Sequence, residues 1–309
     1  MKLSAVIDNY VNFKRGMGMR LSSEAIMLSA FGNAMGDIDI GQVKPRAVQL
    51  FFDRKRPVTT TLRQYFWVLS SFYRYAVGRG FATSTPLPAT LPKIPPPPAH
   101  YIYTVDEIRR LLAATVVLRT PWSPWRPQAF RTFLLLLYGT GLRLAEALAL
   151  TLRDVDLANA VVTVHQGKFF KSRVVPTGPK LTRALADYAN HRRRRHPMPD
   201  YENSAFFADR RGRRWDQRAT QIYFRKVCRR AQVVRQGRGQ QPRLHDIRHA
   251  TAQHRIEAWY RSGEDVQLLL PQLATFLGHR DITSLQCYLH MTPELLRAAA
   301  RRFQSYAQP

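Results

Sequence analysis

Apolar residues recur with a helical period through the first eighty residues of the chain. This period predicts helices over 1–16, 21–31, 43–52 and 59–80. The fourth predicted helix has the most regular apolar face, formed by Leu62, Tyr65, Phe66, Leu69, Phe72, Tyr73 and Ala76. Tyr73 fits this face with its hydroxyl at the edge. We therefore expect a small all-helical domain whose exterior carries basic residues such as Arg63 and Arg74.

The helical pattern stops at a segment that is rich in proline. Seven prolines fall within residues 86–98, and proline at this density fits neither a helix nor a central strand. The segment is expected to be an extended, semi-rigid linker. It places the domain boundary between 1–96 and 97–309.

The second domain combines longer apolar helices with two short β-branched runs. Thr104 and Glu107 have the spacing of a capping box at the start of its first helix. The runs at 161–164 and 173–176 predict a β-hairpin, and its tip presents Lys168 and Lys171. Further helices are expected over 128–139, 142–152, 180–192, 219–231, 244–260 and 293–303. The expected fold class is mainly α with a small β-sheet, so the second domain is an α+β domain.

A helix end, a turn and a new helix are expected around Gly278. The apolar run 268–277 ends there, and glycine suits the left-handed position after a helix. His279 follows in the turn, Asp281 is a suitable N-cap, and Tyr288 falls about two turns into the next helix. A tyrosine on a short helix usually serves packing, so this stretch gains meaning only from the rest of the chain.

The charge of the chain points to a polyanionic partner. Lys and Arg number 48 against 21 Asp and Glu, which gives a net charge of +27 over 309 residues. Residues 1–100 carry 13 basic and 5 acidic residues, and the remainder carries 35 and 16, so both domains are expected to contact the polyanion. No apolar run approaches the roughly 18 residues of a membrane helix, which argues against a membrane partner. With only two cysteines, the expected location is the reducing cytoplasm, and the polyanionic partner would place the protein at the nucleoid.

Several basic residues have both an ordinary and a chemical interpretation. Arg143 opens a helix and could simply pair with Glu146 three residues later. His245 and His249 have the spacing of a metalloprotease motif, but Asp246 replaces its glutamate and Arg248 adds a cation, so we disfavour a metal site. The basic runs 191–196 and 210–214 are typical of solvated or phosphate-neutralising surfaces.

Together these residues predict a phosphoryl-transfer site that needs neither a metal nor another cofactor. Arginine side chains can neutralise the charge that gathers on the nonbridging oxygens of a phosphodiester. A tyrosine can attack the phosphorus and conserve the bond as a phosphotyrosine. A lysine or histidine can then protonate the leaving oxygen.

The motifs, in this order, resemble those of the tyrosine recombinases, the phage integrase family. They are Thr140–Glu146 with Asp154, Gly167–Pro176, His245–His249 and Leu277–Tyr288. They span the expected catalytic domain, whereas 1–96 resembles the core-type DNA-binding domain of the family less specifically. Asp246 departs from the family pattern, which more often has an apolar or small residue there.

The resemblance implies a role for each matching residue. Tyr288 would be the nucleophile that forms a 3′-phosphotyrosyl bond, and Lys168 would be the general acid for the 5′-oxygen. The scissile phosphate would be held by Arg143, Arg248, His245 and His279. Glu146 and His249 would lie behind these groups and orient them. The further DNA contacts that we expect are Arg63, Arg74, Lys171, Arg173 and Arg213.

The implied function is that of a site-specific DNA recombinase of a mobile element. Four copies would assemble on double-stranded DNA and resolve a Holliday junction, with possible accessory recombinases or directionality factors. Two alternatives remain open: a type IB topoisomerase-like enzyme that nicks and closes DNA, and a non-catalytic DNA-binding protein on a recombinase scaffold. The target sequence, the direction of the reaction, and docking of the last helix in cis or in trans also remain open.

Overall fold

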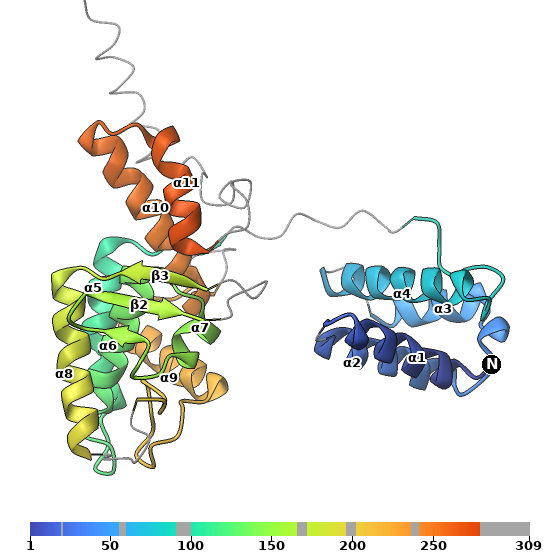
Figure 1. The fold of residues 1–309 in the computed structure, drawn as a ribbon, viewed down its shortest axis with the longest axis horizontal. Helices are drawn as coiled ribbons and strands as arrows, with labels where there is room; N and C mark the ends of the chain where they lie inside the picture. The colour runs from blue at the N-terminus through green and yellow to red at the C-terminus, as the bar shows by residue number, and fades with distance from the viewer. Residues whose placement is uncertain are drawn as a thin grey trace, which may run out of the picture. The chain divides into compact units, whose positions relative to one another are not determined.

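The computed structural model describes residues 1–19, 21–55, 60–90, 100–165, 172–195, 202–235 and 241–278. The chain divides into two compact units, Met1–Pro97 and Pro98–Pro309. Each unit has a hydrophobic core of its own. The described part is mainly helical with one small sheet, which confirms the expected fold class (Figure 1). None of the described helices is both long enough and apolar enough to cross a membrane.

The first unit is a helical bundle. Its elements are α1 (Leu3–Gly16), α2 (Ser22–Met35), the 3-10 turn η1 (Ile40–Gln42), α3 (Pro45–Asp53) and α4 (Thr60–Gly78). The apolar face of α4 is buried as its period predicts, and Phe72 stacks edge-on against Tyr10 of α1.

Tyr73 departs from the prediction. It is only 1% exposed, and its hydroxyl has no hydrogen-bond partner among the described residues. The packing of Phe31 and Phe72 around the ring encloses the hydroxyl as well, and this burial raises the pKa of Tyr73.

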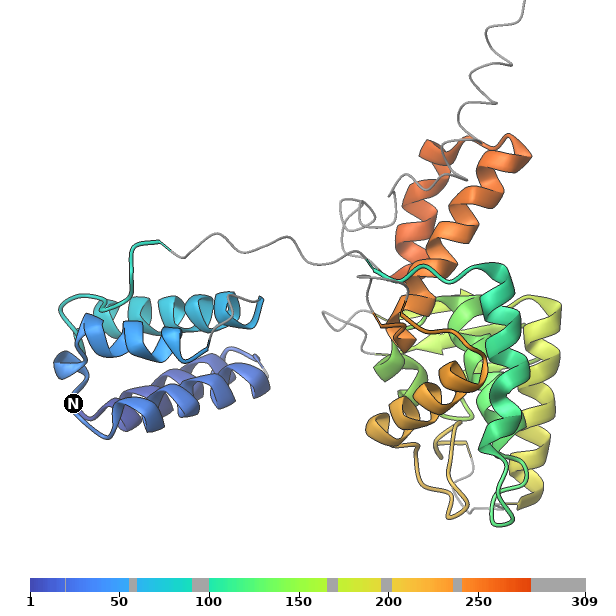
Figure 2. The ribbon, with the colours of Figure 1, turned by 180° about the vertical axis from the view of Figure 1, so that it is seen from behind.

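The second unit is built around helix α6 (Arg126–Thr140), which is buried along most of its length. The other helical elements are α5 (Val105–Ala114), η2 (Thr115–Leu118), α7 (Leu144–Ala149), α8 (Pro179–Arg195), α9 (Gln217–Arg230), α10 (Leu244–Ser262) and α11 (Val266–Leu277). The predicted capping box of α5 is present, because Thr104 and Glu107 exchange side-chain-to-backbone hydrogen bonds. Helices α8 and α10 both pack directly against α6 (Figure 1 and Figure 2).

The sheet has three antiparallel strands in the order β1 (Val155–Asp156), β2 (Val161–Val164) and β3 (Arg173–Pro176). The β2–β3 hairpin was predicted, and its register pairs Val162 with Val175. Both of these side chains are buried against the core, which fixes the face of the sheet that is turned outward. The tip of the hairpin, with Lys168 and Lys171, lies outside the described residues.

The predicted helix over 142–152 is wrong in length, because α7 covers only Leu144–Ala149. The carboxylate of Asp154 accepts hydrogen bonds from the backbone N–H of Thr151, at 2.7 Å, and from its hydroxyl, at 2.8 Å. These bonds stabilise a turn in place of another helical turn. The chain then enters β1 directly.

The fragment 98–309 is expected to fold without the first unit, because its core draws on no residue before Tyr101. Circular dichroism of the isolated fragment should show a helical spectrum and a cooperative thermal transition. The intact chain is the reference for the position of that transition. A fragment without cooperative unfolding would contradict the division of the chain at this point.

Candidate active site

Arg143 lies at the sharp bend between α6 and α7. Gly141 makes the bend possible, because its φ is +61° and a Cβ there would lie 2.5 Å from a side-chain carbon of Leu277. Glu146 then fixes Arg143 in two ways. One carboxylate oxygen accepts the backbone N–H of Arg143 at 3.0 Å, and the other accepts its Nη1 at 2.7 Å. The predicted pair at i, i+3 is therefore present.

Glu146 also binds a second arginine, which comes from the sheet. Arg173, the first residue of β3, donates from Nη2 to Oε2 at 2.8 Å and from Nη1 to Oε1 at 3.3 Å. Burial by itself would raise the pKa of Glu146, but the hydrogen bonds from Arg173 and Arg143 outweigh it and lower the pKa to about 2. The carboxylate is therefore ionised at any physiological pH and holds two guanidinium groups in place.

Arg248 is the most buried of the three arginines, at 2% exposure. It projects from the second turn of α10. Its Nη1 donates to the carbonyl oxygen of Gly141 at 2.5 Å, and its Nη2 donates to that of Leu277 at 2.7 Å. One side chain thus joins the bend beside Arg143 to the end of α11.

All three guanidinium groups bind the C-terminal end of α11. Arg173 donates to the carbonyl of Phe276 at 3.2 Å, Arg248 to that of Leu277, and Arg143 to that of Gly278 at 3.2 Å. The last carbonyls of a helix lack partners within the helix and carry partial negative charge, so cations are favoured there. Gly278 has a φ of +69°, and a Cβ at this residue would lie 2.6 Å from Nη1 of Arg173. The prediction of a left-handed glycine is confirmed.

His245 and His249 lie on the first two turns of α10 and have different environments. His245 is exposed; partial desolvation, together with the charges of Arg248, Arg243 and Arg143, lowers its pKa. Its imidazole is therefore neutral at neutral pH. The rings of His245 and His249 meet edge to face, with centroids 5.1 Å apart. His249 is buried, and that burial, followed by the nearby His100, lowers its pKa to about 3.

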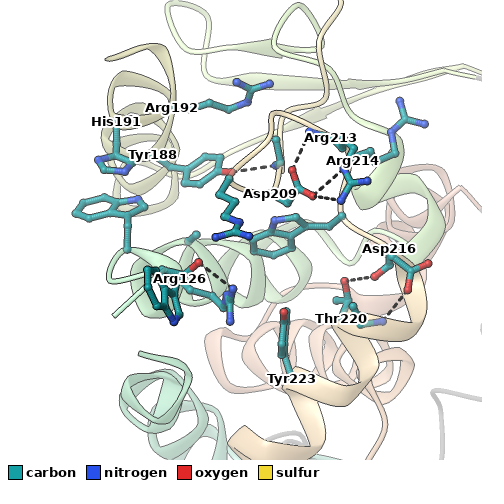
Figure 3. Close-up of a pocket in the computed structure, with 18 of the residues that line it drawn as sticks. Arg126, Tyr188, His191, Arg192, Asp209, Arg213, Arg214, Asp216, Thr220 and Tyr223 are labelled. Atoms are coloured by element: carbon teal, nitrogen blue, oxygen red, sulfur yellow. Dashed lines mark hydrogen bonds and ion pairs between the residues drawn. The ribbon is translucent and has the colours of Figure 1, made fainter. Parts of the chain in front are cut away.

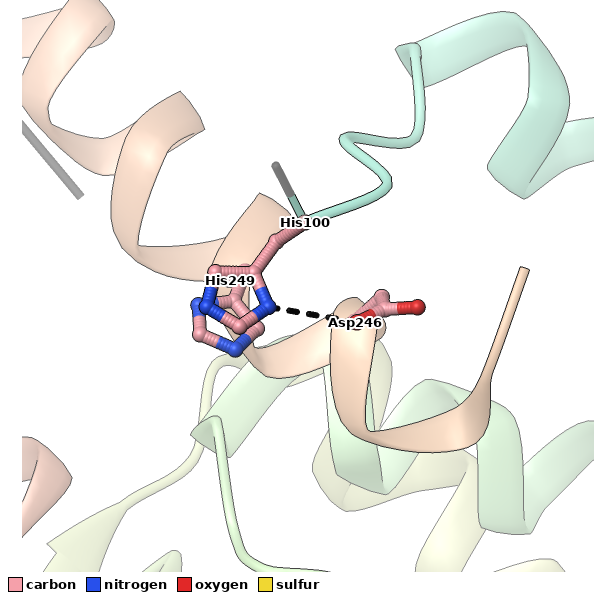
Figure 4. Close-up of side chains that lie close together, drawn as sticks. All are labelled: His100, Asp246 and His249. Atoms are coloured by element: carbon pink, nitrogen blue, oxygen red, sulfur yellow. Dashed lines mark ion pairs between the residues drawn. The ribbon is translucent and has the colours of Figure 1, made fainter. Parts of the chain in front are cut away.

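One group of possible metal ligands occurs among the described residues: His100, Asp246 and His249 (Figure 4). The two imidazoles are stacked 3.9 Å apart and inclined by only 16°, so their in-plane lone pairs run side by side and do not converge on one point. Asp246 is fully buried and accepts hydrogen bonds from the backbone and guanidinium of Arg243. We assign the group to attaching the segment that begins at His100 to the start of α10, and this gives a structural reason for aspartate at residue 246.

Some of the other predicted site residues lie outside the described part of the chain, and the rest differ in exposure. Lys168, Lys171, His279 and Tyr288 lie outside the described residues, although His279 directly follows the end of α11. Arg63 and Arg74 are exposed on α4 of the first unit. Arg213 is exposed and pairs with Asp209 at 3.0 Å. Arg173, which we predicted as a DNA contact, is only 12% exposed in its side chain and positions Glu146. The sequence gave no indication of this contact with Glu146, because Arg173 is only the first residue of a short strand there.

Replacing Glu146 by glutamine is expected to remove an acid-sensitive contribution to stability. Because the folded-state pKa is lowered from 4.5 to about 2, the carboxylate contributes stability that is present above pH 4.5 and is lost as the pH falls toward 2. The shift corresponds to about 3 kcal/mol. Denaturation of the second unit at pH 7 and pH 3 should show a smaller difference for Glu146→Gln than for the wild type. Glu202→Gln, at an exposed residue, is the control, and equal pH dependence of all three proteins would contradict the role of Glu146.

Comparison with known proteins shows which family the chain resembles. The model of the phage integrase family matches residues 103–294. The putative integrase/recombinase y4rB of Sinorhizobium fredii is 30% identical over 301 residues, and the match covers 96% of each protein. Among solved structures, the Tn1549 transposon integrase in complex with transposon right end DNA aligns over 98% of this chain and 100% of that chain, with a TM-score of 0.72 at 17% identity. A lambda integrase tetramer bound to a Holliday junction aligns over 92% of this chain and 79% of that chain, with a TM-score of 0.69 at 16% identity.

The family model covers the bend after α6, the hairpin, α10 and the end of α11. These elements form the arginine cluster, which consists of Arg143, Arg173 and Arg248. The chain belongs to the phage integrase family, the family of the tyrosine recombinases.

Proposed function

We propose that the protein is a site-specific DNA recombinase that cuts and rejoins double-stranded DNA through a 3′-phosphotyrosyl intermediate. The observation that carries the proposal is the convergence of Arg143 and Arg248 on the end of α11. The chain passes from that end directly to His279 and reaches Tyr288 nine residues later. Two positive charges are thus held at the residues that immediately precede the segment with the expected nucleophile.

In the proposed reaction, the hydroxyl oxygen of Tyr288 attacks the scissile phosphorus and gives its proton to the neutral imidazole of His245, and the bond to the 5′-oxygen breaks. Lys168 gives its proton to that leaving oxygen, which becomes a free 5′-hydroxyl. Arg143 and Arg248 neutralise the nonbridging oxygens as charge develops on them, and His245 and His279 add hydrogen bonds. A 5′-hydroxyl then attacks the phosphotyrosine and restores the diester. The phosphotyrosine conserves the bond, so the cycle consumes no ATP and needs no metal.

The mobile-element role is a finer part of the proposal. It is supported by the likeness to a transposon integrase in complex with transposon end DNA and to a lambda integrase tetramer on a Holliday junction. We propose that four copies of this chain exchange strands through such a junction. Met1–Pro97 would bind the duplex with the exposed Arg63 and Arg74, and the second unit would cut it.

The direct test is capture of the covalent intermediate. Purified protein would be incubated in EDTA with nicked duplexes tiled across the DNA that flanks its gene, so that the short cleaved strand diffuses away. We expect a protein–DNA adduct that survives denaturation, and its digest should place the nucleotide on Tyr288. Binding without an adduct on any duplex would favour a non-catalytic DNA-binding protein. An adduct that yields only relaxed plasmids and no recombinants would favour a nicking-closing enzyme.

A further inference from the structure

Described residues of two basic runs line one pocket of the second unit: His191 and Arg192 from the first run, and Arg210, Arg213 and Arg214 from the second (Figure 3). The pocket has a volume of about 570 Å³ and lies where the end of α8, the start of α9 and the start of α6 come together. Arg143 follows the opposite end of α6, and the 15 residues of this helix span about 22 Å. The pocket is therefore a separate site from the arginine cluster.

Aromatic rings form much of the pocket. Trp125 and His191 already stack, with ring centroids 4.0 Å apart and planes inclined by 16°. Trp122 lies at the rim and is 76% exposed, an unusual position for so large an apolar ring. The buried indole N–H of Trp125 has no acceptor within the described part of the chain. A buried donor without an acceptor costs free energy, so the packing of the pocket holds the Trp125 ring in place against a local penalty.

Positive charge surrounds these rings. Among the described residues, the arginines that line the pocket are Arg126, Arg192, Arg210, Arg213 and Arg214. The acidic residues of the lining are already engaged within the protein. Asp209 accepts hydrogen bonds from Arg213 and from the backbone of its own loop, and Asp216 caps α9. The pocket thus offers flat rings and a surplus of positive charge to a ligand.

We propose that this pocket binds single-stranded DNA, with an unpaired base stacked on its tryptophan rings and the adjoining phosphates on its arginines. Base stacking on aromatic side chains beside a positively charged groove is the physical basis of binding to single strands. A volume of about 570 Å³ accommodates a ligand of nucleotide size. The exchange of strands leaves bases unpaired, and the pocket would hold such a segment away from the cutting site.

Other ligands fit the pocket less well. A duplex keeps its bases stacked inside, so a closed helix offers the rings of a concave pocket only its backbone. An acidic peptide also suits arginine, but the chain carries further exposed arginines directly beside lining residues in the sequence: Arg193, Arg194 and Arg211. Several positive charges that are close together match the regularly spaced phosphates of a strand better than the scattered charges of a peptide.

The test is a photo-cross-link between the intact protein and a single-stranded oligonucleotide that carries 5-iodouracil, at moderate salt to suppress non-specific binding. We expect a cross-link to the rings of the pocket, mapped by mass spectrometry. Trp122→Ala should reduce affinity for the oligonucleotide roughly tenfold, while Trp122→Phe, which keeps a ring, should retain most of it. Arg210→Ala should also weaken binding. The matched control is Arg230→Ala, at an exposed arginine near the other end of α9.

Competition separates the possible ligands. An unlabelled single strand should remove the cross-link, while the mononucleotide dTMP and an acidic peptide that contains tryptophan should not at equal concentration. Equal competition by dTMP would overturn the proposal in favour of a free nucleotide, and equal competition by the peptide would overturn it in favour of a protein partner. A cross-link that Trp122→Ala leaves unchanged would also overturn it. Tyr288→Phe should keep the cross-link, so this result does not depend on the cleavage chemistry.

Discussion

Replacing Tyr288 by phenylalanine is expected to abolish strand cleavage and to leave DNA affinity within about twofold of the wild type. The hydroxyl oxygen is the proposed nucleophile, and no other atom of the ring can form the bond to phosphorus. Affinity depends mainly on phosphate contacts from Lys and Arg, which the substitution does not change. Cleavage would be measured as covalent adduct on a nicked duplex, and affinity by a gel-shift titration with the same duplex.

Tyr306→Phe is the matched control for this experiment, because it removes another tyrosine hydroxyl from the same C-terminal stretch. It should cleave like the wild type. A Tyr288→Phe protein that still formed an adduct would show that Tyr288 is not the nucleophile. A large loss of affinity in this variant would show that Tyr288 holds the DNA and that its effect on cleavage is indirect.

Arg248 and Arg143 are expected to differ in what their removal costs, although both should be needed for cleavage. Either substitution by alanine removes charge stabilisation at the phosphate and should lower the cleavage rate about 10²- to 10³-fold. Arg248→Ala also leaves the buried carbonyls of Gly141 and Leu277 without their donor, which should cost roughly 3 kcal/mol of stability. Arg143 is 25% exposed in its side chain, and Glu146 keeps Arg173 in its absence, so Arg143→Ala should lose much less.

Cleavage rates at saturating DNA and denaturation midpoints of the second unit would separate the two effects. Arg261→Ala, at an exposed arginine further along α10, should change neither by much. Equal stability losses for Arg143→Ala and Arg248→Ala would contradict the bridging role of Arg248. Cleavage at the wild-type rate in either variant would remove that arginine from the proposed site.

The prediction of local structure from the sequence was strongest where a single helical turn decides the outcome. The capping box of Thr104 and Glu107 and the pair of Arg143 and Glu146 both join residues three apart, and both are present. The left-handed Gly278 followed from an apolar run that ends at a glycine. The predicted helix over 142–152 is too long for an equally local reason. Asp154 accepts a hydrogen bond from Thr151, and the resulting turn ends α7 early.

The sequence by itself determined the helices, the hairpin and the family, because periodicity, capping and ordered motifs are properties of neighbouring residues. Only the tertiary structure decided that Arg173 shares Glu146 with Arg143, that Arg248 joins Gly141 to Leu277, and that described residues of two basic runs line one pocket. The tertiary structure also buries the hydroxyl of Tyr73, which the helical pattern predicted at the edge of the apolar face of α4. These contacts join segments that are far apart in the chain, and their partners are chosen by how helices and sheet pack together, a property that no local pattern encodes.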